Sequence, residues 1–115
     1  MKVHNVLGNG FQEVIYQRCL AIEMESVGVG FEREKEQPIY YNSIEVGSRR
    51  ADFVVANTIV VELKALISLE DVHLAQAKNY VAAYNFPVGL LINFGATSLQ
   101  YKKIFNNTFK GFESK

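Results

Sequence analysis

Apolar residues near the N-terminus recur at the spacing of a helix and predict one over Phe11–Val27. The positions that would face the core are Tyr16, Leu20, Met24 and Val27. A second apolar set lies on the opposite side of this helix: Phe11, Ile15, Cys19 and Ile22. A helix that is apolar on two sides is packed between two layers or contacts another chain, so the pattern leaves a homodimer open.

Alternating and continuous apolar runs predict strands in much of the remaining chain. Their ranges are Phe31–Lys35 and Ile39–Val46, which form two strands or one bent strand, then the two arms of Arg49–Lys64, Pro87–Gly95 and Leu99–Phe105. Pro38 places the first two runs at a sheet edge or at a break, and Asn42-Ser43 is typical of a turn. Residues 1–7 are mixed in character and predict no definite element.

A second helix is predicted from Ser68 to Asn85. Ser68, followed three residues later by Asp71, has the pattern of a capping box. The predicted inner face consists of Leu69, Val72, His73, Gln76, Tyr80 and Ala83. Gln76 lies in the middle of this face, where its amide either bonds a loop carbonyl or faces a functional site. His73 is interpreted as a packed helix histidine, because no second His or Cys lies at metal-ligand spacing from it.

The order of these elements predicts the fold class. Hairpins come first and a helical crossover comes later, which is typical of an α+β fold with a mixed sheet flanked by helices. The 115 residues are enough for one domain, 1–115, with a single core.

Composition narrows the class of protein without identifying a function. Twelve Lys and Arg balance twelve Asp and Glu, so a contact with nucleic acid would need a local basic patch. The single cysteine excludes an internal disulfide and predicts a reducing compartment. The chain has no apolar run of membrane-spanning length and no signal-peptide pattern, so we expect a cytoplasmic protein without membrane contact.

Candidate chemistry is concentrated in Arg49–Lys64, where charged residues interrupt two apolar strands. Strand alternation places Glu62 and Lys64 on one face, about 6–7 Å apart, and their neighbours Val61 and Leu63 on the other. An acid and a lysine in a strand of buried type need a reason, and a bound metal ion is one. The alternative is an ordinary ion pair on an exposed strand, which the apolar neighbours of Glu62 disfavour.

The turn between these two strands decides whether Asp52 joins the same face. A loop of three residues, 56–58, brings Asp52 opposite Glu62, whereas a two-residue loop shifts the register and turns Asp52 to the other face. Asn57 is suited to a left-handed position in the longer loop. Two facing carboxylates repel, and a divalent cation between them would reverse the sign of that interaction.

Glu13 lies at the start of the first predicted helix, three residues before Tyr16 on the stripe that faces the core. Its carboxylate either points toward the core side or stays in water, where it interacts favourably with the helix dipole. Periodicity alone leaves both interpretations open.

Four short motifs together resemble a known family. They are Gly10-Phe11-Gln12-Glu13-Val14-Ile15-Tyr16, Arg50-Ala51-Asp52, Glu62-Leu63-Lys64 and Gln76-Ala77-Lys78-Asn79-Tyr80. The first is similar to the G-x-x-E-x-x-Y signature of the small GxxExxY proteins, which are placed in the PD-(D/E)XK nuclease superfamily. The next two resemble the aspartate strand and the E-x-K element of that superfamily, and the last resembles the Q-x-x-x-Y element of its exonuclease branch. Each motif alone is weak, but all four occur in the family's order over nearly the whole chain.

The resemblance implies a restriction-endonuclease-like αβββαβ core and a metal-dependent nuclease that hydrolyses nucleic acid, with DNA ranked ahead of RNA as the substrate. The implied ligands of Mg²⁺ or Mn²⁺ are Asp52, Glu62, the carbonyl of Leu63, and Glu13. The implied catalytic residues are Asp52, Glu62 and Lys64. Lys64 would position a metal-activated water or stabilise the pentacovalent phosphate, while Gln76 and Tyr80 would orient the site or contact the DNA backbone.

A second hypothesis is a non-catalytic module on the same fold, which binds nucleic acid or protein or serves as a dimeric accessory subunit. The neutral charge and small size favour it, because a chain of 115 residues has little surface with which to choose a substrate. The intact set of two acids and a lysine favours the nuclease, and we rank the nuclease first.

Overall fold

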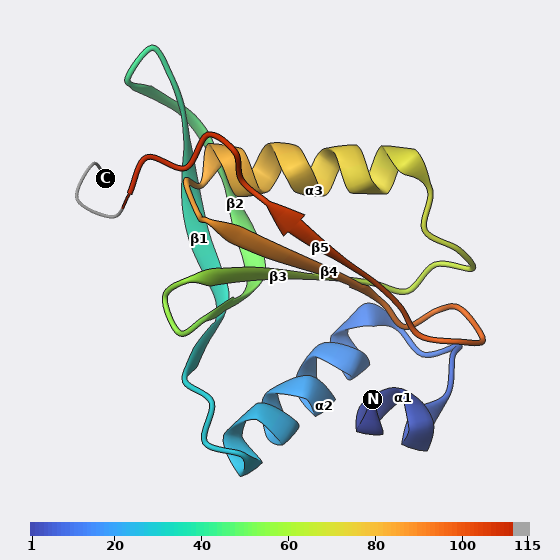
Figure 1. Cartoon of the computed structure of the whole chain (residues 1–115). Coiled ribbons are helices and arrows are strands. Elements are labelled where there is room, and N and C mark those ends of the chain that lie inside the picture. The colour runs from blue at the N-terminus through green and yellow to red at the C-terminus, as the bar shows by residue number, and fades with distance from the viewer. Residues whose placement is uncertain (112–115) are drawn as a thin grey trace.

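A mixed sheet of five strands forms the centre of the computed structural model, which describes residues 1–111 (Figure 1). The strands are β1 (Phe31–Tyr41), β2 (Ile44–Val55), β3 (Ile59–Lys64), β4 (Val88–Asn93) and β5 (Gln100–Phe105). They lie in this order across the sheet, and every neighbouring pair is antiparallel except the parallel pair β3–β4. The last four residues of the predicted domain 1–115 lie outside the described part of the chain.

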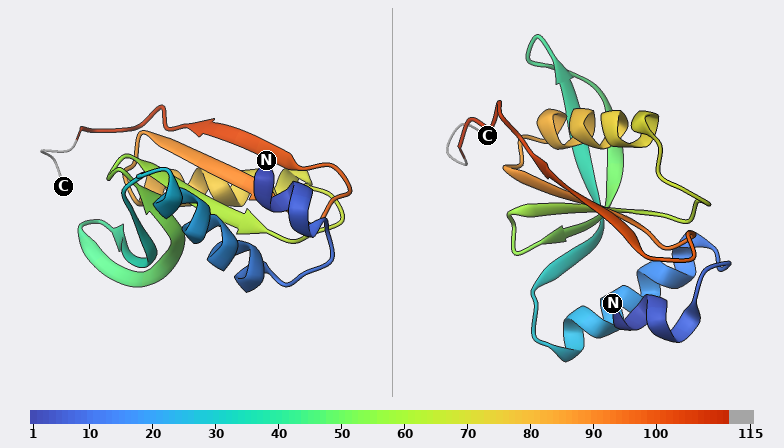
Figure 2. Two further views of the ribbon diagram at one scale, coloured as in Figure 1. Left: turned by 90° about the horizontal axis from the view of Figure 1, so that it is seen from below. Right: turned by 45° about the vertical axis from the view of Figure 1, so that its right-hand side comes forward.

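Helices cover both faces of this sheet (Figure 1, Figure 2). α1 (Lys2–Leu7) and α2 (Glu13–Ser26) pack on one face, and α3 (Asp71–Ala83) packs on the other. α3 is the crossover that a parallel pair of strands requires between β3 and β4. The predicted α+β architecture, a mixed sheet flanked by helices, is therefore confirmed.

Two apolar layers fill the spaces between the sheet and the helices. The layer toward α2 is built around aromatic residues that solvent does not reach: Tyr16, Phe53 and Phe94. The layer toward α3 is built around smaller aliphatic residues: Val54, Val60, Val81 and Leu91. Neighbouring residues of β3 alternate between the two layers, which is the period-two pattern of a strand covered on both faces.

The chain reverses between β1 and β2 at Asn42 and Ser43, which both have positive φ (49° and 64°). This backbone is typical of a two-residue hairpin turn, for which asparagine is well suited. The strand predicted over Ile39–Val46 is therefore wrong, because the turn recognised inside that range divides it between β1 and β2. Pro38 lies in β1 at the edge of the sheet, as expected.

The N-terminus of α3 differs from the predicted capping box. The helix begins at Asp71, so Glu70 and not Ser68 is the N-cap. The N–H of Glu70 donates to Nδ1 of His73 at 3.0 Å. This bond gives His73 a structural role at the end of the helix, in agreement with its interpretation as a helix histidine.

The buried face of α3 also differs from the predicted one. Its fully buried residues are Ala77 and Val81, whereas Val72 is 57 % exposed and Gln76 is exposed as well. The small Ala77 lets the helix lie close to the sheet, and a periodicity judged mainly from large side chains does not register it. The prediction that Gln76 carries a buried amide is therefore wrong.

The two-sided apolar pattern of α2 is explained in part by α1, which the sequence did not predict. α1 packs beside α2, and a groove of about 200 Å³ between them is lined by Lys2, Val3, Val6, Leu7, Cys19, Ile22 and Glu23. Ile22 is still 65 % exposed, and Val27, which was expected in the core, is 71 % exposed just beyond the helix. No helix within residues 1–111 is long and apolar enough to cross a membrane.

A buried asparagine joins the loop after β3 to the loop after β4. Oδ1 of Asn93 accepts the N–H groups of Leu66 (2.8 Å) and Gly95 (3.1 Å). Nδ2 of Asn93 donates to the carbonyl of Leu66 (2.9 Å) and to Oε1 of Gln100 (3.0 Å). A Cβ at Gly95 would lie 2.4 Å from the nitrogen of Leu66, so this close approach of the two loops requires glycine. The network holds the end of β3, and thus Lys64, in place.

We predict that Asn93→Ala lowers the free energy of unfolding by about 3 kcal/mol, because it leaves several buried backbone and side-chain groups without partners. Urea denaturation measures this change. Asn79→Ala on the exposed side of α3 is the matched control and should change stability by less than about 0.5 kcal/mol. Equal effects of the two substitutions would contradict the role of this network.

Candidate active site

The turn between β2 and β3 has the three-residue form that the metal hypothesis requires. Residues 56–58 form the loop, and Asn57 has the predicted left-handed backbone, with φ 55°. The β2–β3 ladder ends one residue short of Asp52 and Glu62, which would be the next pair in the same register. The two acids therefore lie at the point where the ladder between these strands opens.

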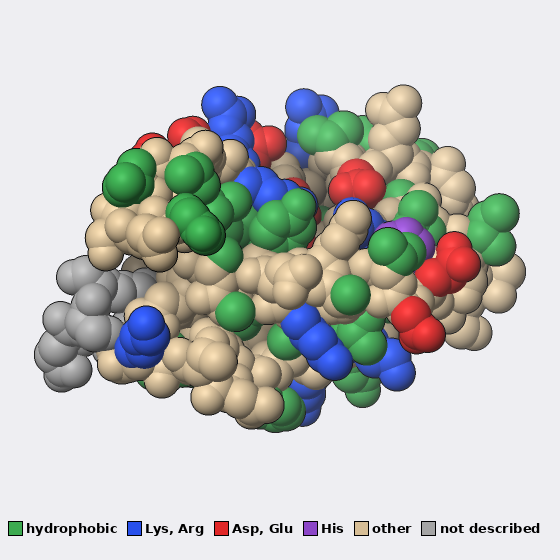
Figure 3. All heavy atoms as spheres, turned by 90° about the horizontal axis from the view of Figure 1, so that it is seen from above, with side chains coloured by type: hydrophobic (Ala, Val, Ile, Leu, Met, Phe, Trp, Pro, Cys, Tyr) green, Lys and Arg blue, Asp and Glu red, His purple; other side chains and the backbone are tan. Residues whose placement is uncertain are grey.

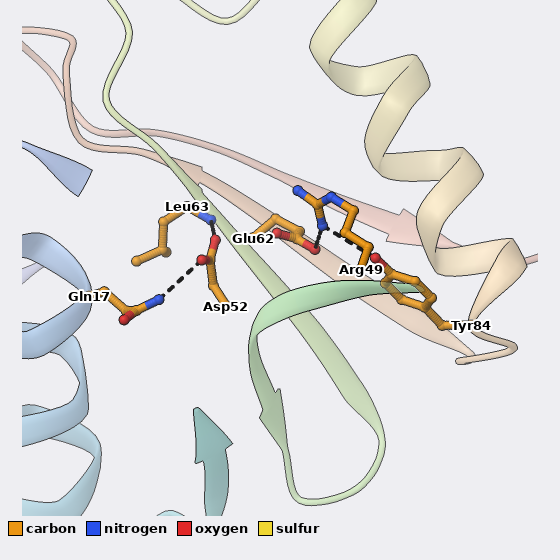
Figure 4. A network of polar contacts seen from close by, with 6 residues as sticks. All are labelled: Gln17, Arg49, Asp52, Glu62, Leu63 and Tyr84. Carbon is orange, nitrogen blue, oxygen red and sulfur yellow. Dashed lines mark hydrogen bonds and ion pairs between the residues drawn. The ribbon is translucent and has the colours of Figure 1, made fainter. Parts of the chain in front are cut away.

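Asp52 connects β2 with both β3 and α2 through its carboxylate (Figure 4). Oδ2 accepts the N–H of Leu63 at 2.7 Å, and Oδ1 accepts a hydrogen bond from Nε2 of Gln17 at 3.1 Å. The N–H and C=O of one residue in an extended strand point to the same side. The carbonyl of Leu63 is therefore directed toward the Asp52 side of β3.

Glu62 is buried in β3, and its partner is Arg49 of β2. The side chain of Glu62 is only 7 % exposed, and its Oε1 lies 2.7 Å from Nη1 of Arg49. Burial raises the pKa of Glu62 to about 7 in spite of the opposing effect of Arg49, and the nearby Asp52 adds to the rise. The alternative of an ordinary Glu62–Lys64 pair on an exposed strand is therefore wrong.

Arg49 is held by two tyrosines of α3 as well as by Glu62. Its guanidinium carbon lies 4.1 Å from the centre of the Tyr80 ring, and Nη1 donates to the hydroxyl of Tyr84 at 3.3 Å. The two tyrosine rings stack on each other, with centroids 5.9 Å apart. Desolvation acts to lower the pKa of Arg49, but the contacts with Tyr84 and Glu62 raise it overall, so the guanidinium is charged.

Glu13, the first residue of α2, lies near Asp52 on the face of the sheet that carries α2. Its side chain is exposed to solvent, as one of the two interpretations expected. Partial burial and the charge of Asp52 nevertheless raise its pKa, while Lys64 and Arg49 act in the opposite direction. Glu13 thus belongs to the same electrostatic cluster without being buried in it.

Tyr16 explains how the start of α2 is positioned. Its hydroxyl donates to the carbonyl of Gly8 at 2.6 Å and accepts the N–H of Phe11 at 3.2 Å. Its buried ring stacks on Phe94, with centroids 4.6 Å apart. Gly10 lies between these contacts with φ 112°, a conformation that favours glycine. The loop is thereby fixed so that α2 begins with Glu13 at the site.

The remaining predicted site residues line a small hollow between β3 and α3. Its walls are Arg49, Glu62, Lys64, His73, Gln76, Ala77, Tyr80 and Leu91. Basic and acidic side chains gather around a hollow on the face that carries α3 (Figure 3). Nζ of Lys64 and the amide of Gln76 make no hydrogen bond to any residue in the described range, so both are available to a ligand.

The donor atoms at this site suit a hard cation. They are carboxylate and carbonyl oxygens, and Oε1 of Gln17 is a further buried oxygen without a partner in residues 1–111. Three acids, Glu13, Asp52 and Glu62, face only two cations, Arg49 and Lys64. No three His, Cys, Asp or Glu side chains of the described residues converge into a complete metal site. Asp52 and Glu62 could supply part of the coordination shell of a divalent cation, and water would supply the rest.

Sequence reasoning did not identify three residues of this cluster: Gln17, Arg49 and Tyr84. Gln17 lies one helical turn after Glu13, and Tyr84 lies one turn after Tyr80, so each shares a face with a predicted site residue. These i, i+4 relationships could have indicated both residues. Arg49 gave no comparable signal, because its contacts depend on how β2 crosses α3.

Comparisons with known proteins agree with this architecture. The crystal structure of SSO0001 matches with a TM-score of 0.63 and 20 % identity, over 82 % of this chain and 50 % of that chain. The alkaline exonuclease LHK-Exo from Laribacter hongkongensis matches with a TM-score of 0.56 and 10 % identity, over 78 % of this chain and 54 % of that chain. The chain thus spans about half the length of each. No curated protein matches the sequence.

These structural similarities concern the fold alone, which is restriction-endonuclease-like, as the resemblance implied. The family is shown separately by a model of the PD-(D/E)XK nuclease superfamily that matches residues 1–104. That match includes Asp52, the Glu62-Leu63-Lys64 element and the cluster built around them. The chain belongs to the PD-(D/E)XK nuclease superfamily.

Proposed function

We propose that this protein is a metal-dependent nuclease that hydrolyses phosphodiester bonds in nucleic acid, with DNA as its substrate. One observation carries the proposal: Asp52 and Glu62 lie together where β2 and β3 separate, beside a lysine whose side chain makes no hydrogen bond or ion pair with a described residue. Burial makes the ionised form of Glu62 costly despite its contact with Arg49. A divalent cation would relieve that cost and is what phosphodiester hydrolysis needs.

The proposed metal ligands are Asp52, Glu62, the carbonyl of Leu63, and Glu13. The Leu63 carbonyl is supported by its direction toward Asp52, and Glu13 by its place in the same electrostatic cluster. When bound, Mg²⁺ or Mn²⁺ would lower the pKa of a coordinated water and offset the charge of a phosphate. The exposure of Glu13 suits an outer ligand that acts through water.

The other proposed roles belong to side chains that line the hollow. Lys64 would place its ammonium group against the attacking water or the pentacovalent phosphate, because it lies on the same strand face as Glu62. Gln76 would contact the substrate backbone with its exposed amide. Tyr80 would act by orienting Arg49, on which its ring stacks.

Within the superfamily we assign the chain to the GxxExxY proteins. Each residue of the signature has a distinct part in placing α2: Gly10 permits the turn, Glu13 begins the helix at the site, and Tyr16 fixes the loop. This division of roles supports the assignment.

A non-catalytic or dimeric accessory protein is the second candidate. The groove between α1 and α2 favours it, because Val6 and Ile22 line this groove and are 72 % and 65 % exposed. Exposed apolar residues that cluster in this way are typical of contact surfaces. The groove lies on the opposite face of the sheet from α3, so such a contact would leave the proposed site open.

We predict Mg²⁺- or Mn²⁺-dependent cleavage of labelled DNA that falls about 100-fold or more in Asp52→Asn, Glu62→Gln and Lys64→Ala. To identify the substrate, cleavage is compared on denaturing gels for single- and double-stranded DNA and RNA of the same sequence. Glu45→Gln, near the β1–β2 turn, and Lys2→Ala, in α1 on the face opposite α3, remove the same charges at exposed positions away from the site and should retain activity.

Calorimetric titration of Mn²⁺ accompanies the cleavage assay. Saturable binding that is lost in Asp52→Asn and Glu62→Gln is the expected result. Absence of both heat and cleavage when metal and nucleic acid are added together would contradict the nuclease and favour the binding module.

We predict that the stability of the metal-free protein falls as the pH rises from about 5 to 7. The folded protein holds a proton on Glu62 up to a pKa of about 7, whereas the unfolded chain releases it near 4.5. The unfolded state is therefore favoured across this window by about 3 kcal/mol, and the loss is complete above it. Urea denaturation with a chelator present measures this slope, and Glu62→Gln should flatten it. If the free energy of unfolding changed with pH to the same extent in both proteins, titration of Glu62 would not be the cause.

If the α1–α2 groove is a homodimer surface, Ile22→Glu should convert a dimer to a monomer in light scattering coupled to size-exclusion chromatography. The substitution places a charge in an apolar contact that would have to be desolvated. Glu25→Gln on the exposed side of α2 is the control. A monomer for the unmodified protein at high concentration would exclude the homodimer.

A further inference from the structure

We propose that Arg49 binds a phosphate group of the substrate. In the metal-free protein Arg49 is paired with the carboxylate of Glu62, and a metal ion that binds this carboxylate would displace it. This inference rests on the proposed nuclease function. It starts from the fact that Arg49 occupies the carboxylate that the metal needs: Nη1 lies 2.7 Å from Oε1 of Glu62. The inference assigns a role to a residue that none of the four sequence motifs includes.

The guanidinium of Arg49 is presented with part of its donor edge unused. Both of its hydrogen bonds, to Glu62 and to Tyr84, come from Nη1. Nε and Nη2 have no hydrogen-bond partner among residues 1–111, and the side chain is about one-third exposed, at 32 %. A planar guanidinium with a free pair of N–H donors matches the geometry of a phosphate group. Arg49 can therefore reach a ligand in the hollow that it lines with Lys64.

A metal ion and Arg49 compete for Glu62, because both are cations and the carboxylate is buried. At close range a unit charge and a divalent ion repel by more than 1 kcal/mol even with strong screening. Tyr80 and Tyr84 do not take part in this competition, since they hold the guanidinium by its face and by one hydrogen bond. They would keep Arg49 beside the site after its bond to Glu62 is lost.

This exchange couples the two binding events. In the free protein the charge of Arg49 lowers the affinity of the site for a metal ion. A phosphate that binds Arg49 neutralises this charge and so removes the effect. Metal and nucleic acid should then each increase the affinity for the other, and the coupling should depend on Arg49. A purely structural Arg49–Glu62 ion pair predicts a different result, because its loss would disorder Glu62 and weaken metal binding.

Calorimetric titration of Mn²⁺ into the free protein tests the first half of the proposal. Arg49→Gln should bind Mn²⁺ about tenfold more tightly than the unmodified protein, because a cation next to the ligand has been removed. Arg49→Lys keeps the charge and should stay within about threefold of the unmodified protein. Equal or weaker binding by Arg49→Gln would overturn the proposal.

Fluorescence anisotropy of a labelled DNA duplex, with Mn²⁺ present, tests the second half. Lys64→Ala serves as the background in which cleavage is slowed. Both Arg49→Gln and Arg49→Lys should weaken DNA binding about tenfold or more, because lysine cannot replace the planar guanidinium fork. The gain in Mn²⁺ affinity on adding DNA should also shrink in Arg49→Gln. Unchanged DNA affinity in both variants would overturn the proposal.

A measurement on the unmodified chain covers the case in which the variants do not fold. The Nε–Hε signal of Arg49 in an NMR spectrum should shift when Mg²⁺ is added and shift again when DNA follows. A signal that does not respond to either addition would overturn the exchange.

The two proposals fail in different ways. If the unmodified protein binds Mn²⁺ and Glu62→Gln does not, but Arg49→Gln behaves like the unmodified protein, only the role of Arg49 is wrong. If neither the unmodified protein nor Arg49→Gln binds Mn²⁺, either alone or together with DNA, and neither cleaves DNA, the nuclease and the exchange are both wrong.

Discussion

The burial of the Glu62 carboxylate is the constraint on which the rest of the site depends. A charged group in the middle strands of a covered sheet is costly unless cations and hydrogen-bond donors surround it. Arg49 reaches it from the neighbouring strand, and Tyr80 and Tyr84 of α3 hold Arg49 in turn. A single acid in β3 thus accounts for the contacts that join β2, β3 and α3 at this point (Figure 4).

The opposite face of the sheet is organised around Tyr16. Its ring is part of the aromatic core with Phe94, while its hydroxyl closes the loop that precedes α2. One residue therefore combines packing with the placement of Glu13 and Gln17 at Asp52. The core and the site are built from the same helix, so the position of the acids follows from packing of the core.

The fold and much of the site could be predicted because their signals are local. The strand carrying Glu62 is apolar on both sides, and the three-residue turn with left-handed Asn57 follows from short-range backbone preferences. The buried face of α3 could not be placed so well, because Ala77 gives little hydrophobic signal although it is where the helix meets the sheet. The cap of α3 was misplaced for a related reason, since Ser68 and Glu70 both lie in a segment rich in candidate caps.

The sequence by itself determined the order of the strands and the two main helices and the identity of the acids and lysine, because each depends on neighbours along the chain. It limited the β2–β3 hairpin to two registers, and the structure has the one with the three-residue loop. Only the tertiary structure decided which cation meets Glu62. Strand alternation pairs it with Lys64, but the partner is Arg49, which lies thirteen positions away and whose direction is set by α3. The side chain of Lys64 consequently makes no hydrogen bond or ion pair within residues 1–111, although its charge acts on Glu13. The physical reason is that a buried carboxylate pairs with whichever donor the packing of the helix on the sheet places next to it. That packing depends on residues far apart in the sequence, so no short stretch predicts it.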